Sequence, residues 1–196
     1  MSAVSSASVF IDVVRPTSRP WLAAYQVLLV AFGAVSIALS AQAMIPLPFT
    51  PVPVTLQTLA VLLIGALYGS RRGALTVATY IVCGALGLPV FAAGGFGLAR
   101  LAGPTGGYIL GFIAAAFLVG LLAERGFDRK PLTAGLMMIA GTVTIFAFGL
   151  SWLVLDVGVG NVLAMGLLPF IPGAVAKILV ALALLPAGWR LLKLKR

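Results

Sequence analysis

The chain alternates long apolar segments with short clusters of Lys and Arg, and this alternation constrains the fold more than any other feature. Each of six apolar segments has about the length that a helix needs to cross a lipid bilayer, or slightly less. If all six cross, eleven of the thirteen basic residues fall on one side. Because basic residues in short loops stay cytoplasmic, we expect both termini in the cytoplasm. The eleven are Arg15, Arg19, Arg71, Arg72, Arg125, Arg129, Lys130, Arg190, Lys193, Lys195 and Arg196.

The composition excludes most other classes of protein. Hydrophobic residues make up 62% of the chain and charged residues 9%, whereas about a quarter of a soluble domain is charged. The net charge of +9 does not indicate a nucleic-acid partner, because the basic residues are split into short clusters between apolar segments. The chain has no His and one Cys, which excludes a His general base and a metal site built from His or Cys. We therefore expect no cofactor, no metal and no enzymatic activity.

The apolar segments predict an all-α membrane protein with six transmembrane helices. Four prolines between positions 46 and 53 cannot continue a helix, and they separate the first two segments. We expect residues 1–20 to form a cytoplasmic tail and residues 21–196 to form a single membrane domain. The expected helices are residues 21–44, 54–69, 73–87, 106–123, 132–155 and 171–192. The loops on the outer side are expected at residues 45–53, 88–105 and 156–169.

Arg100 and Lys177 are the two basic residues that this topology does not explain. Arg100 lies in an outer loop, and Lys177 lies in the last helix, roughly 9 Å below its outer end. A charged side chain in the apolar part of a membrane protein is costly and is commonly functional. Other uncommon polar residues also fall in the outer half of the protein. The resulting candidates for ligand binding are Thr55, Gln57, Arg100, Tyr108, Asp156, Asn161 and Lys177.

Several of these residues also have a purely structural explanation. Thr55 and Gln57 can cap the second helix, and Tyr108 can belong to an aromatic belt at the membrane surface. Arg100 can reach lipid headgroups, and Asp156 can end the fifth helix. Their positions in the chain do not distinguish these roles from ligand binding.

Lys177 points most directly to a ligand. Pro172 and Gly173 open the helix before it, and no acid lies at helical spacing to neutralise it. A lone ammonium in such a place needs an anion, which a ligand can supply. Two bases with one nearby acid favour an anionic small molecule, most simply a carboxylate. The glycine-rich residues 94–97 and 103–107 add exposed backbone N–H donors.

Four motifs occur in one order along the chain: PVPVTLQT at residues 51–58, GLPVFA at 87–92, GPTGGY at 103–108 and PFIPG at 169–173. With these motifs the chain resembles the BioY family, the biotin-binding S components of energy-coupling factor (ECF) transporters. The resemblance implies the ECF S-component fold of six helices and high-affinity capture of biotin from the outer side. It also implies a bacterial cytoplasmic membrane as the location. The implied partners are membrane lipid, a transmembrane T component and two cytoplasmic ATPases.

The resemblance assigns roles to particular residues. Lys177 matches the family's lysine in the last helix, and Arg100 matches the basic residue before the Gly-Pro-Thr motif. The family often has an acid directly after Pro-Phe-Ile-Pro-Gly, whereas this chain has Ala174. Either Asp156 replaces that acid or the affinity for biotin is lower. The residues that hold the ureido ring are therefore less defined than those that hold the carboxylate.

S components also present a stripe of small residues on the first helix to the T component. Ala34 and Ala38, four residues apart, are our candidates for this interface. Packing within the helices of the same chain explains these two alanines equally well.

Two other functions are alternatives to a binding subunit. An intramembrane enzyme that acts on lipid would need catalytic groups, and the chain has neither His nor a deep pair of carboxylates. A solitary, proton-linked carrier for biotin or another small carboxylate normally needs a titratable carboxylate in mid-membrane. Asp156 lies too near the edge of the membrane to serve in this way.

Overall fold

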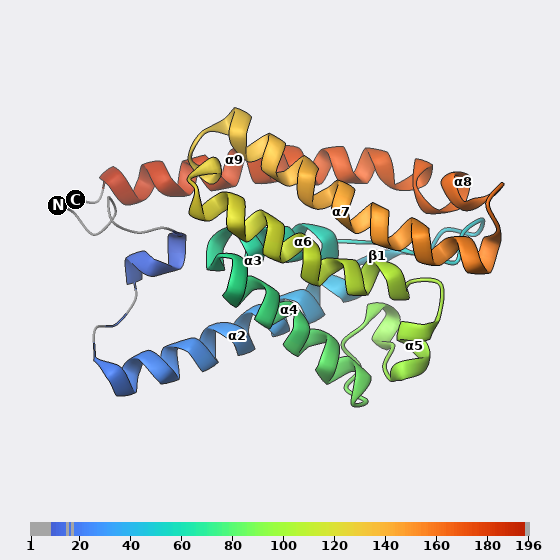
Figure 1. Ribbon diagram of the computed structural model, residues 1–196, viewed down its shortest axis with the longest axis horizontal. Coiled ribbons are helices and arrows are strands. Elements are labelled where there is room, and N and C mark those ends of the chain that lie inside the picture. The colour runs from blue at the N-terminus through green and yellow to red at the C-terminus, as the bar shows by residue number, and fades with distance from the viewer. Residues whose placement is uncertain (1–8, 15, 17, 195–196) are drawn as a thin grey trace.

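The computed structural model of the chain is a bundle of long helices with three connecting loops gathered at one end (Figure 1). It describes residues 9–14, 16 and 18–194. The basic residues Arg15, Lys195 and Arg196 lie outside these residues, as do the side chains of Arg19 and Lys193. The six principal helices of the described part are α2 (Arg19–Gln42), α3 (Gln57–Tyr68), α4 (Ser70–Ala85), α6 (Gly106–Glu124), α7 (Pro131–Val157) and α9 (Ile171–Leu194).

Short elements occupy the connections between these helices. A two-stranded antiparallel ribbon joins α2 to α3, in which Met44 pairs with Thr55 and Ile45 with Val54. The ribbon strands are β1 (Met44–Ile45) and β2 (Val54–Thr55). The other connecting elements are η2 (Ala92–Gly94), α5 (Leu98–Ala102), η3 (Phe127–Arg129), α8 (Val162–Gly166) and η4 (Leu168–Phe170).

Glycine and proline set the helix boundaries, as the sequence predicts. Gly69 has a φ of 85°, a left-handed value that side chains disfavour, and it separates α3 from α4. Pro131 occupies the first turn of α7, where a backbone N–H would have no partner within the helix. The prolines between residues 46 and 53 follow the end of α2 at Gln42, so only the short ribbon forms there.

The two ends of the bundle differ in character (Figure 1). One end, here termed the loop end, carries the ribbon, α5 and α8. The other, the basic end, carries the start of α2, the turn between α3 and α4, η3 and the end of α9. Exposed basic side chains belong to the basic end, namely Arg71, Arg125, Arg129, Lys130 and Arg190. Arg100 and Lys177 lie away from this cluster, as the sequence predicts.

The six predicted helices are confirmed, with the largest differences at the second and third, which begin at residues 57 and 70 rather than 54 and 73. Four segments of the described chain are long and apolar enough to cross a membrane: residues 21–42, 106–124, 131–157 and 162–192. With 12 and 16 residues, α3 and α4 are shorter. At about 1.5 Å per residue, both helices are shorter than the roughly 30 Å thickness of the hydrocarbon core. Both pack against α6 and against each other, so protein rather than lipid covers much of their surface.

Part of the predicted N-terminal tail is folded against the bundle. Val9 and Ile11 are buried, and η1 (Phe10–Val14) packs against α3. The Arg72 guanidinium forms a salt bridge with the Asp12 carboxylate at 2.9 Å. Residues 1–8 of the predicted tail lie outside the described residues. The apolar run at residues 9–14 is too short to show a helical period, which is why the sequence predicts only a tail there.

Close contacts between helices depend on glycine. Gly120 of α6 lies against the start of α4, and a methyl group at this position would overlap the backbone of Ser70. Gly65 of α3 faces the backbone of Ala116 on α6 in the same way. Because the hydrophobic effect between helices is weak in lipid, such close backbone packing is a main source of helix association. The helix α6 therefore packs closely against both α3 and α4.

A buried carboxyl group closes the basic end. Asp128 in η3 is fully buried, and its Oδ2 accepts a hydrogen bond from the indole N–H of Trp189 on α9. Its Oδ1 has no hydrogen-bond partner among the described residues. Burial raises the pKa of the Asp128 carboxyl above its usual value, and the Trp189 hydrogen bond and the charge of Arg129 oppose this shift.

We predict that Asp128→Asn is tolerated at neutral pH and gains stability relative to the wild type as the pH rises. Because the folded-state pKa is raised, the folded protein holds the proton more tightly than the unfolded chain. That stabilisation is complete below the unfolded pKa, about 3.9, and is lost as the pH rises through the folded pKa. Thermal unfolding of both proteins in detergent, from acidic to alkaline pH, measures the difference. A variant that loses stability relative to the wild type as the pH rises would show that the folded protein favours the charged carboxylate.

Candidate ligand-binding site

A cavity lies between α3, α6, α7 and α9, toward the loop end of the bundle. Most of its lining is aliphatic or aromatic. Eight polar or charged side chains interrupt this lining: Thr55, Gln57, Thr58, Arg100, Thr105, Tyr108, Thr142 and Lys177. Among the described residues that line the cavity two are basic and none is acidic, so the cavity suits a largely apolar molecule with a negative charge.

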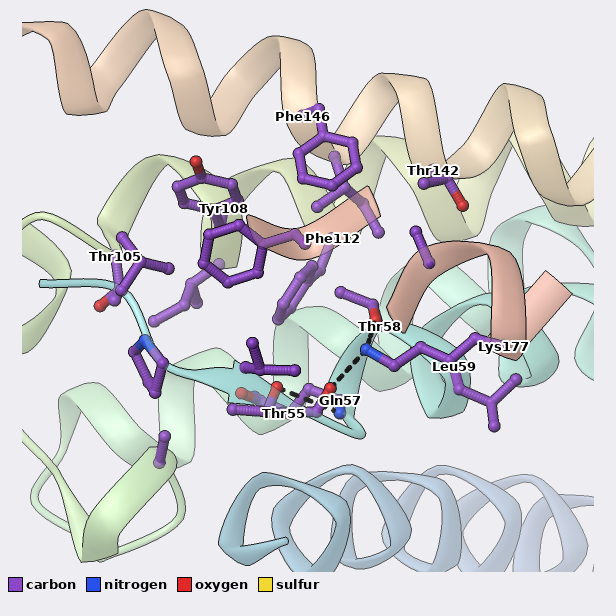
Figure 2. A pocket seen from close by; sticks show the side chains of 18 of the residues that line it. Thr55, Gln57, Thr58, Leu59, Thr105, Tyr108, Phe112, Thr142, Phe146 and Lys177 are labelled. Carbon is purple, nitrogen blue, oxygen red and sulfur yellow. Dashed lines mark hydrogen bonds between the residues drawn. The ribbon is translucent and has the colours of Figure 1, made fainter. Parts of the chain in front are cut away.

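Lys177 is held in position by the segment that joins β2 to α3. Its ammonium donates hydrogen bonds to the backbone oxygen of Thr55 at 2.5 Å and to Oγ1 of Thr58 at 2.8 Å. Figure 2 shows the side chain extending from α9 toward this segment, with the rings of Tyr108 and Phe146 on another side of the cavity. An ammonium has three N–H donors, so the third can bind a ligand. Neither protein oxygen carries a full charge, and an anion would be the stronger acceptor.

A second set of hydrogen bonds orients Gln57. Its Nε2 donates to the Tyr80 hydroxyl at 2.6 Å, and this hydroxyl donates to the backbone oxygen of Val90 at 3.2 Å. The backbone N–H of Gln57 also donates to Oγ1 of Thr55 at 3.3 Å, although the N-cap residue of α3 is Leu56, which makes no side-chain capping bond. Gln57 lines the cavity, and with Nε2 bound to Tyr80 its remaining side-chain acceptor is Oε1. Such an acceptor can receive an N–H from a ligand.

Three aromatic rings form an apolar wall of the cavity. The ring centroids of Tyr108, Phe146 and Phe170 lie 6.4 to 6.5 Å apart. The Tyr108 hydroxyl donates to the backbone oxygen of Gly166 at 2.8 Å, which attaches α6 to α8. The hydroxyl thus has a structural partner, and the Tyr108 ring belongs to this aromatic cluster. A cluster of rings in edge-to-face and tilted contact suits the apolar body of a small molecule.

Arg100 reaches the cavity from α5, in the connection between α4 and α6. It is half-buried, and its side chain packs beside Gly95, where an added methyl group would lie 3.3 Å from Nε. No carboxylate forms a salt bridge with Arg100 or Lys177 in the described part of the chain. The cavity therefore receives two uncompensated positive charges from two different segments.

Five of the seven predicted site residues line this cavity: Thr55, Gln57, Arg100, Tyr108 and Lys177. Asp156 and Asn161 do not line it, and both are exposed near the end of α7 and before α8. The Asn161 amide donates to the backbone oxygen of Val157 at 3.2 Å, so it stabilises the local turn. Depth along a helix, which the sequence gives, does not separate inward-facing from outward-facing side chains.

The predicted partner contacts, Ala34 and Ala38, are half-buried and pack against the core of this chain. The exposed face of α2 carries larger apolar residues, among them Phe32, Val35 and Leu39. A contact between the two alanines and a partner protein therefore stays a prediction.

Sequence reasoning missed several side chains that complete the cavity. Thr58 and Thr142 were not predicted, because a single Thr in an apolar helix commonly bonds to its own backbone. Thr105 was not predicted either, although it precedes α6 in the same motif as Tyr108. Tyr80 was missed because its role is indirect, through the amide of Gln57. For Thr58 a signal did exist, since it lies in the same motif as Thr55.

Comparisons with known proteins agree with this architecture. The BioY family model matches residues 14–194. The chain belongs to the BioY family. The biotin transporter BioY of Rhizobium etli is 40% identical over 165 residues, which are 79% of this chain and 87% of that protein. The biotin transporter BioY of Thermotoga maritima is 42% identical over 143 residues, 71% of this chain and 82% of that protein.

A solved structure of a biotin S component has the same fold as this BioY family member. The crystal structure of the S component for biotin from an ECF-type ABC transporter matches with a TM-score of 0.78 and 25% identity. The match covers 90% of this chain and 95% of that chain. The predicted S-component fold is thereby confirmed, and the chain is an integral membrane protein.

We predict that Lys177 and Thr58 are energetically coupled in the protein without ligand. Thr58→Val removes the hydroxyl but keeps the branched shape, so the ammonium loses one acceptor. This change should cost about 1 kcal/mol beside Lys177 and much less beside Met in a Lys177→Met background. Thermal unfolding of the wild type, the two single variants and the double variant in detergent measures the coupling. Thr142→Val, also in the cavity, is the matched control, and an equal cost of Thr58→Val in both backgrounds would contradict the prediction.

Proposed function

We propose that this BioY family member is the substrate-binding subunit of a membrane vitamin transporter and that its substrate is biotin. The observation that carries the proposal is an apolar cavity with two basic side chains and no acidic one among its described lining residues. Biotin has the complementary chemistry. Its valerate chain ends in a carboxylate, its body carries an apolar thioether ring, and its ureido group has two N–H donors and one carbonyl acceptor.

In the proposed complex, each part of biotin has a partner in the cavity. Lys177 binds the carboxylate with its third N–H, and Arg100 is the second candidate for this charge. The rings of Tyr108, Phe146 and Phe170 cover the apolar body. Oε1 of Gln57 accepts a ureido N–H, in place of the acid that relatives often have at the position of Ala174. The carboxylate contact dominates, because a charge-assisted hydrogen bond is about twice as strong as a neutral one.

The proposed orientation follows from the basic residues. The positive-inside rule places the basic end, and with it both termini, in the cytoplasm of a bacterium, so that the loop end and its cavity face outward. The sequence contains no Gly-Lys-Ser/Thr nucleotide-binding motif. The energy for release on the inner side would then come from partners, a T component and two cytoplasmic ATPases, with Ala34 and Ala38 of α2 as the proposed contact.

A proton-linked solitary carrier is less consistent with this cavity. Coupling to protons normally requires a titratable carboxylate within the membrane, and none lines the described part of the cavity. Asp156 is exposed at the end of α7, outside the cavity. We therefore propose a binding subunit rather than a carrier that works alone or an enzyme.

We predict that Lys177→Ala weakens biotin binding at least about tenfold, because a charge-assisted hydrogen bond is worth roughly 1.5–3 kcal/mol and each 1.4 kcal/mol is one decade. Equilibrium binding of labelled biotin to the purified chain in detergent measures the change. Arg100→Ala, tested in parallel, should have the smaller effect.

Biotin amide, which lacks the negative charge, is the control ligand for both variants. It should bind the wild type weakly and lose much less affinity on Lys177→Ala than biotin does. If biotin and its amide lose equally, Lys177 does not bind the carboxylate. If the charge-dependent loss appears only for Arg100→Ala, the ligand lies in the reverse orientation.

We also predict that the basic end is cytoplasmic. Arg71 and Phe96 are exposed at opposite ends of the bundle. In a Cys83→Ala background, Arg71→Cys should react with a membrane-impermeant thiol reagent only after the cells are opened, and Phe96→Cys should react in intact cells. The opposite labelling pattern would place the cavity on the cytoplasmic side.

A further inference from the structure

One segment of the connection between α4 and α6 closes part of the cavity, and it is here termed the cover segment, residues 90–94. Phe91 and Ala92 of this segment line the cavity. The Phe91 side chain is fully buried and meets the Tyr80 ring edge to face, with ring centroids 5.5 Å apart. The inner side of the cover segment is therefore packed against the residues that hold Gln57.

Gln42 of α2 binds the backbone of the cover segment from its other side. Its Nε2 donates to the backbone oxygen of Phe91 at 3.1 Å, and its Oε1 accepts the backbone N–H of Gly94 at 3.1 Å. Both polar atoms of one amide thus bind the same segment, and the amide belongs to the last residue of α2. Leu, which has a similar size, could make neither bond.

The backbone of the cover segment needs such support. Ala93 has a φ of 59° and Gly94 a φ of 66°, so two consecutive residues are in the left-handed region. For Ala93 this conformation is disfavoured by contacts of its Cβ with the backbone. A strained segment persists only where its surroundings hold it, and the amide of Gln42 supplies two of the contacts that do so.

The helix α2 that carries Gln42 lies at the edge of the bundle (Figure 1). It packs on α3, α4 and η2, and most of its apolar surface is exposed. A displacement of the C-terminal end of α2 would therefore move Gln42 and release the cover segment, without disturbing α6, α7 and α9.

We propose that Gln42 is a positioning residue for ligand binding. It holds the cover segment closed over the cavity and so sets the rates at which the ligand enters and leaves. The proposal rests on the proposed function only in taking biotin as the ligand.

The test is the exchange kinetics of labelled biotin with the purified full chain in detergent, comparing the wild type with Gln42→Leu. A ligand must pass the cover segment both to enter and to leave the cavity. If the segment opens more often, the association rate and the dissociation rate therefore both rise. Association and dissociation rates should each rise about fivefold, and the dissociation constant should change less than about twofold. A residue that merely packs the cavity wall would raise the dissociation rate and leave the association rate unchanged, which would overturn the proposal.

Hydrogen exchange of the ligand-free protein gives a second, independent measurement. Peptides that cover residues 88–103 should exchange faster in Gln42→Leu, while peptides from α6 and α7 stay unchanged. Gln42→Glu provides a variant of similar size that keeps an acceptor for Gly94 but cannot donate to Phe91. It should speed biotin exchange by less than Gln42→Leu does.

Gln26→Leu is the matched control, because it makes the same change sixteen positions earlier in α2. It should leave biotin kinetics and hydrogen exchange as in the wild type. Equal behaviour of Gln42 and Gln26 variants in both measurements would overturn the proposal. If the wild type binds no biotin, the proposed function fails. Faster hydrogen exchange of residues 88–103 in Gln42→Leu would still show that Gln42 holds the cover segment in place.

Discussion

The proposed binding site depends on keeping one ammonium group charged inside an apolar cavity. Lys177 projects from a membrane helix, where an unpaired charge is costly, and the chain supplies no carboxylate to pair with it among the described residues. Two neutral oxygens, the Thr55 carbonyl and the Thr58 hydroxyl, hold it instead. They stabilise the cation without cancelling its charge, and they attach α9 to the segment that opens α3. The same contacts that make the charge tolerable therefore keep it free to attract an anion.

Side-chain contacts to backbone oxygens organise the rest of the loop end in the same way. The Thr50 hydroxyl donates to the backbone oxygen of Met165, and the Tyr108 hydroxyl donates to that of Gly166. The first bond joins the loop after α2 to α8, and the second joins α8 to α6. Gln42 adds the cover segment to this set. The loops of this end are thus joined to one another and to the helices by a few side-chain polar groups.

The fold could be predicted from the sequence because lipid imposes a simple rule on it. Long apolar segments in lipid have to be helices, and the basic clusters indicate which turns face the cytoplasm. Six helices can therefore be predicted without knowledge of their packing. Lys177 and Arg100 were found because they break that rule. Asp156 and Asn161 were chosen by depth alone, and the structure places them on the surface of the loop end. Depth is set by position in the chain, whereas the direction of a side chain is set by helix packing, which the sequence does not state.

Contacts between distant segments are the other part that the sequence could not reveal. Thr58 approaches Lys177 across 119 positions of the chain, and Gln42 approaches Phe91 across 49. Neither pair has a spacing that a helix or strand would bring together. The segment at residues 9–14 is short, and its partners Arg72 and Trp189 lie far along the chain, so neither its period nor its contacts could be predicted.

We propose that this cavity selects biotin. The most direct measurement exposes the purified full chain to an equimolar mixture of vitamins and other small carboxylates, removes the unbound molecules, and identifies what is retained by mass spectrometry. The chain should retain biotin, at one molecule per chain. Retention of a different carboxylate in its place, or of none of the mixture, would contradict it.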